Sequence, residues 1–531
     1  MSSRQRFCEP NRVSLNRQSV GDGDKKEFVA GKSTKETVKT IARGKPGDFR
    51  RNRGDYRVLP TNAHGLRVLR APGFPCSLCQ RGTTSGQTSG ATGAARRVHA
   101  FLIGLGLKMP QRSVIPFGEV LLMTFHADFS SQDYYRNPAA AIEKLRNAGP
   151  VVEVNFPIIG KVWATTTQAL ADQVLKDTDT FSIRDDEGAV VGLKWWMPPV
   201  VRTIANSMLS VDDPDHKRLR DIVDEAFRRR AVLDMEPHVQ ALGNELADEL
   251  FAEGDPADIV ERFARKLPLS VICELLGLPL SDRPKFIAWA SGFTRFSGAL
   301  GFLLMMPNML AMKRYIERHL EAVRQRGGEG LIAEIVRVEK DGGQISRDEI
   351  VAMVFLLLFA GHETTTHLIS GSVHELLRNP DLRDWLKADW SRADLAVEEF
   401  LRFISPVQFT KPRYVRRDVA LGGVRLRRGD RVMPMLAAAN MDPQANPHPE
   451  RLDLQRKPNR HIAFGTGIHF CLGHQLARME GRCALKSLFQ RWPGLTLAVD
   501  ESEISWRKRP GMKAINRLPV LAGQEKVRLV A

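Results

Sequence analysis

A cysteine surrounded by glycines is the strongest chemical signal in this chain. Cys471 lies in the segment HIAFGTGIHFCLGHQLAR, residues 461–478, with Gly465, Gly467 and Gly473 close to it. Glycine tolerates positive φ, so such a loop can turn tightly and direct several backbone N–H groups towards one sulfur. A helix that begins just after Cys471 adds its dipole, and both effects favour a thiolate. A stabilised thiolate is a nucleophile or a metal ligand, whereas an isolated cysteine in a glycine-rich turn is more often inert.

The pattern around Cys471 also includes Phe464, Gly465, His469 and Gly473. In this arrangement it resembles the heme-binding signature of the cytochrome P450 family. The resemblance implies that Cys471 is the axial thiolate ligand of heme b (iron protoporphyrin IX). It also implies that Phe464, Gly465 and Gly473 belong to the loop that approaches the porphyrin. A thiolate ligand pushes electron density onto the iron and favours cleavage of the O–O bond.

A second segment, residues 360–365 (AGHETT), follows an apolar run with a glycine and an acid–alcohol pair. Glycine inside a helix costs roughly 1 kcal/mol relative to alanine, which suggests a local role for Gly361. In the family that the chain resembles, this glycine opens a groove for dioxygen. Glu363 and Thr364 would then be the catalytic residues that deliver protons. His362 is expected only to face a neighbouring helix.

A third pair, Glu399 and Arg402, is spaced by three residues on an expected helix, so the two side chains can pair on one face. Such a pair by itself is usually solvated. Its position before the Cys471 loop resembles the buried Glu–Arg pair of the family, which implies a structural role under the heme.

The two propionates of a heme need cationic or hydrogen-bonding partners. The resemblance assigns this role to residues that would otherwise be read as ordinary surface charges: His216, Arg220, Arg413, His461 and His469.

The elements expected to position these residues are mainly helices, accompanied by small sheets. The long central helix should begin with the capping box at Ser346 and Glu349 and end before Asn379–Pro380. Gly160–Lys161 is expected at the turn of a hairpin. Helices are expected over 138–148, 213–230, 237–253, 259–276, 282–296, 309–326, 330–340, 346–378, 394–404 and from after Cys471 to about 491, with strands in 151–166, 415–424, 431–436 and 495–520.

Charge and composition divide the chain into two parts. Residues 1–122 hold 22 Lys and Arg against 8 Asp and Glu, so most of the net charge of +17 lies there. This segment has little periodicity and includes a lone CxxC, Cys76–Cys79, without a second pair of zinc ligands. We interpret it as a disordered or mis-annotated extension. Few aromatic residues accompany its basic ones, so nucleic-acid binding is not expected. Residues 123–531 are expected to form one large, mainly α domain of the cytochrome P450 type.

The expected location is the cytoplasm. The six cysteines are scattered rather than arranged as a disulfide framework. No apolar run approaches the roughly 20 residues of a membrane span, and the N-terminus lacks a signal-peptide pattern.

The resemblance implies a monooxygenase that inserts one oxygen atom from O2 into a small apolar organic substrate. The chain has no glycine-rich dinucleotide motif and no fused redox domain, so electrons should come from a ferredoxin or flavodoxin-type donor with its NAD(P)H reductase. Two alternatives are a heme-thiolate peroxygenase, which tends to lose the acid–alcohol pair, and a heme-based sensor without turnover. Terpenoid, steroid, fatty-acid and aromatic substrates are all compatible with the sequence.

Two further groups of residues are assigned by position. Segments 188–197 and 293–312 fall where the family builds its substrate pocket, and both are rich in apolar residues and methionine. A basic face that would attract an acidic electron donor is expected from Arg478, Arg482, Lys486, Lys217, Arg218 and Arg228–Arg230.

Overall fold

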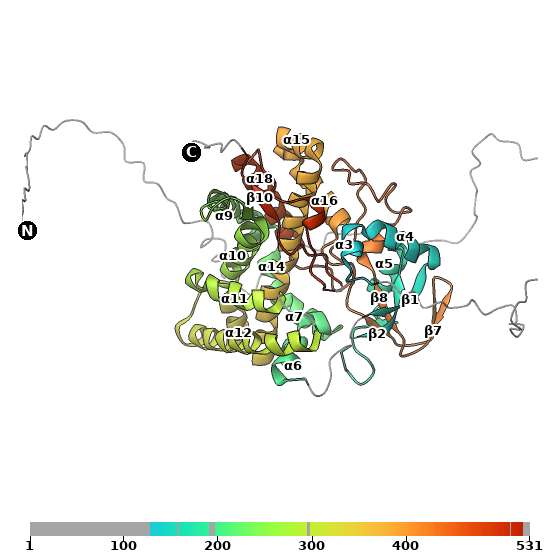
Figure 1. Cartoon of the computed structure of the whole chain (residues 1–531). Coiled ribbons are helices and arrows are strands. Elements are labelled where there is room, and N and C mark those ends of the chain that lie inside the picture. Colours follow the sequence, from blue (N-terminus) through green and yellow to red (C-terminus); the bar gives the residue numbers. More distant parts are fainter. Residues whose placement is uncertain (1–127, 157–158, 191–196, 295–297, 510, 524–531) are drawn as a thin grey trace, which may run out of the picture. The chain divides into compact units, whose positions relative to one another are not determined.

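The structure, a computed structural model, describes residues 128–156, 159–190, 197–294, 298–509 and 511–523. The extension expected over residues 1–122, with its CxxC, lies outside them. Helices dominate the described part of the chain (Figure 1), as the sequence predicts. They are α3 (Gln132–Arg136), α4 (Pro138–Ala148), α5 (Gln168–Lys176), α6 (Pro199–Ala205), α7 (Asp215–Asp224), α8 (Arg229–Asp234), α9 (Glu236–Asp248), α10 (Lys266–Leu276), α11 (Arg283–Thr294), α12 (Gly298–Arg326), α13 (Leu331–Lys340), α14 (Arg347–Arg378), α15 (Pro380–Ala388), α16 (Ala393–Ile404), α17 (Leu436–Asn440) and α18 (His474–Arg491).

The strands form three small sheets. The largest has the order β1-β2-β8-β5-β3, in which β2 and β8 are parallel and the other neighbours antiparallel. A second has the order β4-β10-β9, and β6 pairs with β7. The strands are β1 (Val151–Phe156), β2 (Gly160–Thr165), β3 (Phe181–Ser182), β4 (Ala257–Asp258), β5 (Arg413–Val415), β6 (Val419–Leu421), β7 (Val424–Leu426), β8 (Arg431–Pro434), β9 (Thr496–Leu497) and β10 (Pro519–Leu521).

The long helix α14 is the centre of the helical part, and it packs against α10, α16 and α18 (Figure 1). It begins with the expected capping box, in which the Ser346 hydroxyl accepts the Glu349 N–H and the Glu349 carboxylate accepts the Ser346 N–H. The same carboxylate accepts a hydrogen bond of 2.6 Å from Arg218 of α7. The capping box therefore also joins α14 to α7.

Helix α14 is long and apolar enough to cross a membrane by length and composition alone. However, 72% of its most apolar stretch is buried inside the protein. Its packing against three neighbouring helices explains the apolar run as part of the hydrophobic core.

Gly361 of α14 has a packing reason that the sequence did not suggest. A Cβ atom at this position would lie 3.2 Å from Cγ1 of Ile272, on α10. The absent side chain therefore lets α10 and α14 approach closely. The dioxygen groove that the resemblance implies at Gly361 stays a prediction.

Some expected boundaries were wrong. Strand β1 ends at Phe156, which pairs with Gly160, so Gly160 and Lys161 belong to β2 instead of forming the turn. The helix expected over 213–230 is divided, because a 3-10 turn over Glu225–Phe227 separates α7 from α8. The strand expected over 431–436 ends at Pro434, and the alanine-rich helix α17 follows.

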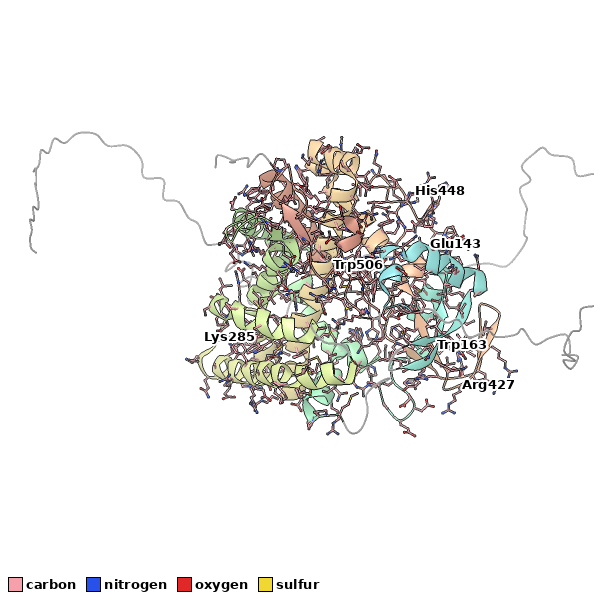
Figure 2. The ribbon with its side chains drawn as sticks, viewed as in Figure 1. Glu143, Trp163, Lys285, Arg427, His448 and Trp506 are labelled. Carbon is pink, nitrogen blue, oxygen red and sulfur yellow. The ribbon has the colours of Figure 1, made fainter. Side chains whose placement is uncertain are left out.

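Large apolar side chains are mostly buried inside the fold, and many charged side chains are exposed at its surface. Trp506 lies within the fold with 5% of its surface exposed, whereas Lys285, Arg427 and His448 lie at its outside (Figure 2).

Candidate active site

The loop before Cys471 is shaped by two glycines with positive φ. Gly465 has a φ of 68° and Gly467 a φ of 73°. A Cβ at Gly467 would lie 2.2 Å from the carbonyl oxygen of Leu175, so only glycine fits against the end of α5. The Cys471 N–H donates to the Phe464 carbonyl at 3.0 Å and closes the loop.

The sulfur of Cys471 faces groups that favour a negative charge. The backbone N–H of Gly473, the N-cap of α18, donates to it, and the guanidinium groups of Arg220 and Arg478 add positive potential. Burial nevertheless outweighs these effects and raises the pKa of the Cys471 thiol. The thiolate therefore needs a further positive partner, such as a metal ion, because metal binding displaces the thiol proton.

The surroundings of Cys471 fit a metal that is carried by a cofactor. Cys471 keeps part of its surface accessible, although the surrounding protein desolvates the thiol and raises its pKa. Within the described ranges, no three His, Cys, Asp or Glu side chains are grouped to hold a metal ion. A porphyrin supplies four ligands of its own, so a single protein thiolate is a suitable fifth.

Three of the five expected propionate partners lie together. The rings of His216 and His469 meet edge to face at 4.4 Å, and Asp212 lies 3.8 Å from His469 Nε2. Arg413 of β5 donates to the Phe181 carbonyl of β3 at 3.2 Å. The His469 Nε2 and Arg413 Nε atoms are buried without a hydrogen-bond partner. Buried orphan donors of this kind fit an anionic group such as a propionate.

Asp212 is an ionised carboxylate within the cluster. Burial alone would raise the pKa of its carboxyl, but His469, the Ser182 hydroxyl and the Ile183 N–H lower that pKa to about 2. Burial lowers the pKa of His216 and of His469, so Arg413 is the fixed cation of the cluster. Asp212 had no local sequence signal, because its partners lie far away in the chain.

The other two expected partners, Arg220 and His461, bond other groups of the protein, and their role with the propionates stays a prediction. Arg220 donates to the carbonyl groups of Ile468 and Phe470, at 3.3 and 2.8 Å, and so holds the Cys471 loop itself. His461 lies 2.8 Å from the Glu398 carboxylate, outside the cluster of His216, His469 and Arg413.

The acid and the alcohol of α14 have different neighbours. The Thr364 hydroxyl donates to the Ala360 carbonyl at 2.9 Å. Glu363 is buried, and its carboxylate accepts from Arg509 at 2.5 Å and lies 3.9 Å from His367 Nε2. Burial would raise the pKa of Glu363, but His367 and Arg509 outweigh it and hold this pKa well below its usual range. The second carboxylate oxygen, Oε2, is buried without a partner.

Arg509 links Glu363 to the surface. About a third of its side chain is exposed, whereas only 5% of the Glu363 side chain is. The guanidinium also lies over the Phe359 ring at 5.4 Å. No local sequence pattern indicates this contact, because Arg509 lies in an irregular segment near the C-terminus. His362 is buried and contacts the Leu358 carbonyl at 2.5 Å, so it belongs to the packing of α14.

Glu399 and Arg402 form a fully buried pair. Two hydrogen bonds of 2.8 Å join the carboxylate and the guanidinium. Arg456 and Asn459 also donate to Glu399, at distances of 3.0 to 3.2 Å. Removing one partner of a buried ion pair costs roughly 3–5 kcal/mol. The pair and Arg456 therefore fix the segment before the Cys471 loop to α16.

The expected basic face is largely neutralised. Arg478 contacts Glu398 at 2.5 Å, and Arg482 contacts both Glu236 and Asp394 at 3.1 and 2.9 Å. The cations of α7 have partners as well: Lys217 pairs with Asp221, and Arg218 pairs with Asp215 and Glu349.

Comparison with known proteins places this arrangement in a family. The family model described as Cytochrome P450 matches residues 304–393 and 393–502. The chain is 38% identical over 402 residues to the vitamin D(3) 25-hydroxylase of Pseudonocardia autotrophica, covering 75% of this chain and 96% of that protein. It is 34% identical over 415 residues to the 6-deoxyerythronolide B hydroxylase of Saccharopolyspora erythraea, covering 75% and 99%.

Solved structures agree with the sequence relatives. The cytochrome P450 PksS of the Bacillus subtilis 168 bacillaene polyketide synthase superposes with a TM-score of 0.68 at 32% identity, covering 76% of this chain and all of that one. Members of the family carry a heme with a cysteine thiolate ligand. The chain belongs to the cytochrome P450 family, and it is a monooxygenase of that family.

Proposed function

We propose that this protein binds heme b through Cys471 and inserts one oxygen atom from O2 into a small apolar organic substrate. The single observation that carries the proposal is the environment of the Cys471 sulfur: a glycine loop, the Gly473 N–H and two guanidinium groups surround the thiol and favour its thiolate form. Two relatives are named hydroxylases, of vitamin D(3) and of 6-deoxyerythronolide B, which supports hydroxylation as the reaction.

The residues around the heme would hold and orient it. His216, His469 and Arg413 would bind a propionate, which supplies a partner for the His469 Nε2 and Arg413 Nε atoms. Arg220 would act through the loop, since it binds two of the loop's carbonyl groups. When bound, the heme supplies the activation of dioxygen.

Thr364 and Glu363 would manage the protons of the reaction. The Thr364 hydroxyl donates to the Ala360 carbonyl at rest and would turn from it during the reaction. His367 and Arg509 hold Glu363 ionised, and the partly exposed Arg509 side chain brings it near solvent. For Glu363 to pass a proton inward, its carboxylate must leave Arg509.

The electrons would come from a ferredoxin or flavodoxin-type donor with its NAD(P)H reductase, in the cytoplasm. The retained acid–alcohol pair disfavours the peroxygenase alternative. It equally disfavours a sensor without turnover, because a sensor has no use for proton delivery.

The decisive experiment replaces the proposed ligand. Cys471→His should abolish the thiolate-type absorption spectrum of the reduced CO complex, while the Cys273→Ala and Cys483→Ala variants keep it. Those two thiols are inert controls, because burial raises the pKa of each to about 12. A thiolate-type spectrum that survives in Cys471→His would exclude Cys471 as the ligand.

A further inference from the structure

Among the described residues, Lys411 has no carboxylate partner, and it lies next to the cluster that is proposed to bind a propionate. Its Nζ donates to the Ser210 hydroxyl at 2.5 Å. No Asp or Glu carboxylate in the described part of the chain lies within 4.0 Å of Nζ. The undescribed internal residues, 157–158, 191–196, 295–297 and 510, include no Asp or Glu in the sequence. The charged group that acts most on Lys411 is Arg184, another cation.

The position of Lys411 follows from two parallel sets of contacts. Lys411 contacts Ser210. Two residues further along each segment, Arg413 interacts electrostatically with Asp212. The two segments therefore run side by side. Lys411 lies one step along them from Arg413, whose Nε is an orphan donor.

The Lys411 side chain is partly exposed. The surrounding protein nevertheless desolvates the ammonium group enough to lower its pKa to about 8. A desolvated ammonium is stabilised when an anion accompanies it.

We propose that Lys411 and the Ser210 hydroxyl bind a carboxylate beside the cluster of His216, His469 and Arg413. The ammonium supplies the charge and two further N–H donors, and the hydroxyl fixes its direction. The carboxylate belongs either to a heme propionate or to an otherwise apolar substrate. This inference rests on the proposed function, because that cluster is the one proposed to hold the heme.

The test compares the Lys411→Met holoenzyme with Lys513→Met. Lys513 is also a buried lysine, but it lies over the Trp506 ring at 5.1 Å, outside the cluster. If the carboxylate is a propionate, heme transfer to an acceptor globin becomes about tenfold faster in Lys411→Met only, as expected for the loss of one hydrogen bond to a charged group. If the carboxylate belongs to the substrate, the rate of heme transfer is unchanged in Lys411→Met. Dodecanoate, titrated against the heme absorption band, then binds about tenfold more weakly to Lys411→Met than to the wild type. The binding of methyl dodecanoate, which lacks the carboxylate, does not change.

Lys411→Arg retains the charge and should restore the affected property. The inference is overturned if Lys411→Met matches the wild type and Lys513→Met in heme transfer and in dodecanoate binding. It is overturned equally if Lys411→Arg loses heme or folded protein as completely as Lys411→Met. These outcomes are separate from failure of the proposed function, which would appear as a wild-type protein without the thiolate-type CO spectrum.

Discussion

The ionisation of the Cys471 thiol depends on the groups that surround the sulfur. The Gly473 N–H and two arginines favour the thiolate, yet burial raises the pKa of the thiol in the protein alone. Heme uptake should therefore release the thiol proton, so that ligand and cofactor charge are established together. The sequence shows the glycines that make this environment, but the balance between burial and hydrogen bonding needs the structure.

Thr364→Ala should uncouple oxygen reduction from product formation. The variant lacks the hydroxyl that donates to Ala360 at 2.9 Å and that is proposed to deliver protons. We expect NAD(P)H consumption to continue, while product per NAD(P)H falls by about tenfold and released hydrogen peroxide rises. Thr366→Ala is the matched control, because its hydroxyl bonds the His362 carbonyl in the same way from a buried position. Unchanged coupling in Thr364→Ala would remove its role in proton delivery.

The free energy of unfolding should depend on pH because of Glu480. Burial raises the pKa of this carboxyl to about 8, from an ordinary value of 4.5, although a hydrogen bond with Thr365 opposes the shift. Between these values the folded protein holds a proton that the unfolded chain has released. Stability therefore falls as pH rises from about 5 to 8.

Glu480→Gln should remove this loss of stability. At pH 8 the variant should have a free energy of unfolding greater than that of the wild type by roughly 2–4 kcal/mol. The difference should shrink towards pH 5, where both side chains are neutral. Denaturant unfolding at the two pH values measures it, and parallel pH profiles of the two proteins would contradict the prediction.

Helices and strands were predicted best from the sequence where several local signals agree on their bounds. The capping box at Ser346, the apolar run and Asn379–Pro380 together defined α14. Helix α17 was missed because LAAAN follows a strand pattern without a capping signal. The pairing of β2 with β8 joins distant parts of the chain, so no local pattern could reveal it.

The same division applies to the candidate site. Glu399 and Arg402 pair within one helix, so their spacing predicted the contact. Arg456, Asp212 and Arg509 join the site through contacts between distant segments, for which the sequence carries no periodic signal. Site residues that share a short motif could be predicted from the sequence. Site residues that join through tertiary packing could not.

For the whole molecule, we predict that residues 1–108 are dispensable. Their basic charge and weak periodicity separate them from the domain that contains every site residue. A chain that begins at Met109 should bind heme at full occupancy and turn over at the rate of the complete chain. The ratio of heme absorbance to protein measures occupancy. A truncated protein that loses heme would show that the first residues support the domain.

The electron donor should be a small acidic protein that docks beside α18. Most cations there are paired, but Lys486 makes no ion pair with the described residues, and a surface pocket of about 480 Å³ is lined by Leu233, Gln475 and Met479 among others. Lys486→Glu should slow reduction by the donor severalfold at low salt, with the effect lost as salt screens the charges.

Arg482→Glu would be a poor probe, because it breaks two ion pairs. Substrate binding should be unaffected in Lys486→Glu, which makes it the internal control. A reduction rate that changes neither with salt concentration nor in Lys486→Glu would rule out electrostatic docking at this face.

The contact between Gly467 and Leu175 joins distant parts of the sequence at the candidate cofactor site. The loop that carries Cys471 packs so closely against the end of α5 that a Cβ at Gly467 would lie 2.2 Å from the Leu175 carbonyl oxygen. Early and late sequence of the domain therefore meet behind the proposed ligand. Heme loading should consequently report the packing of the domain as well as the loop itself.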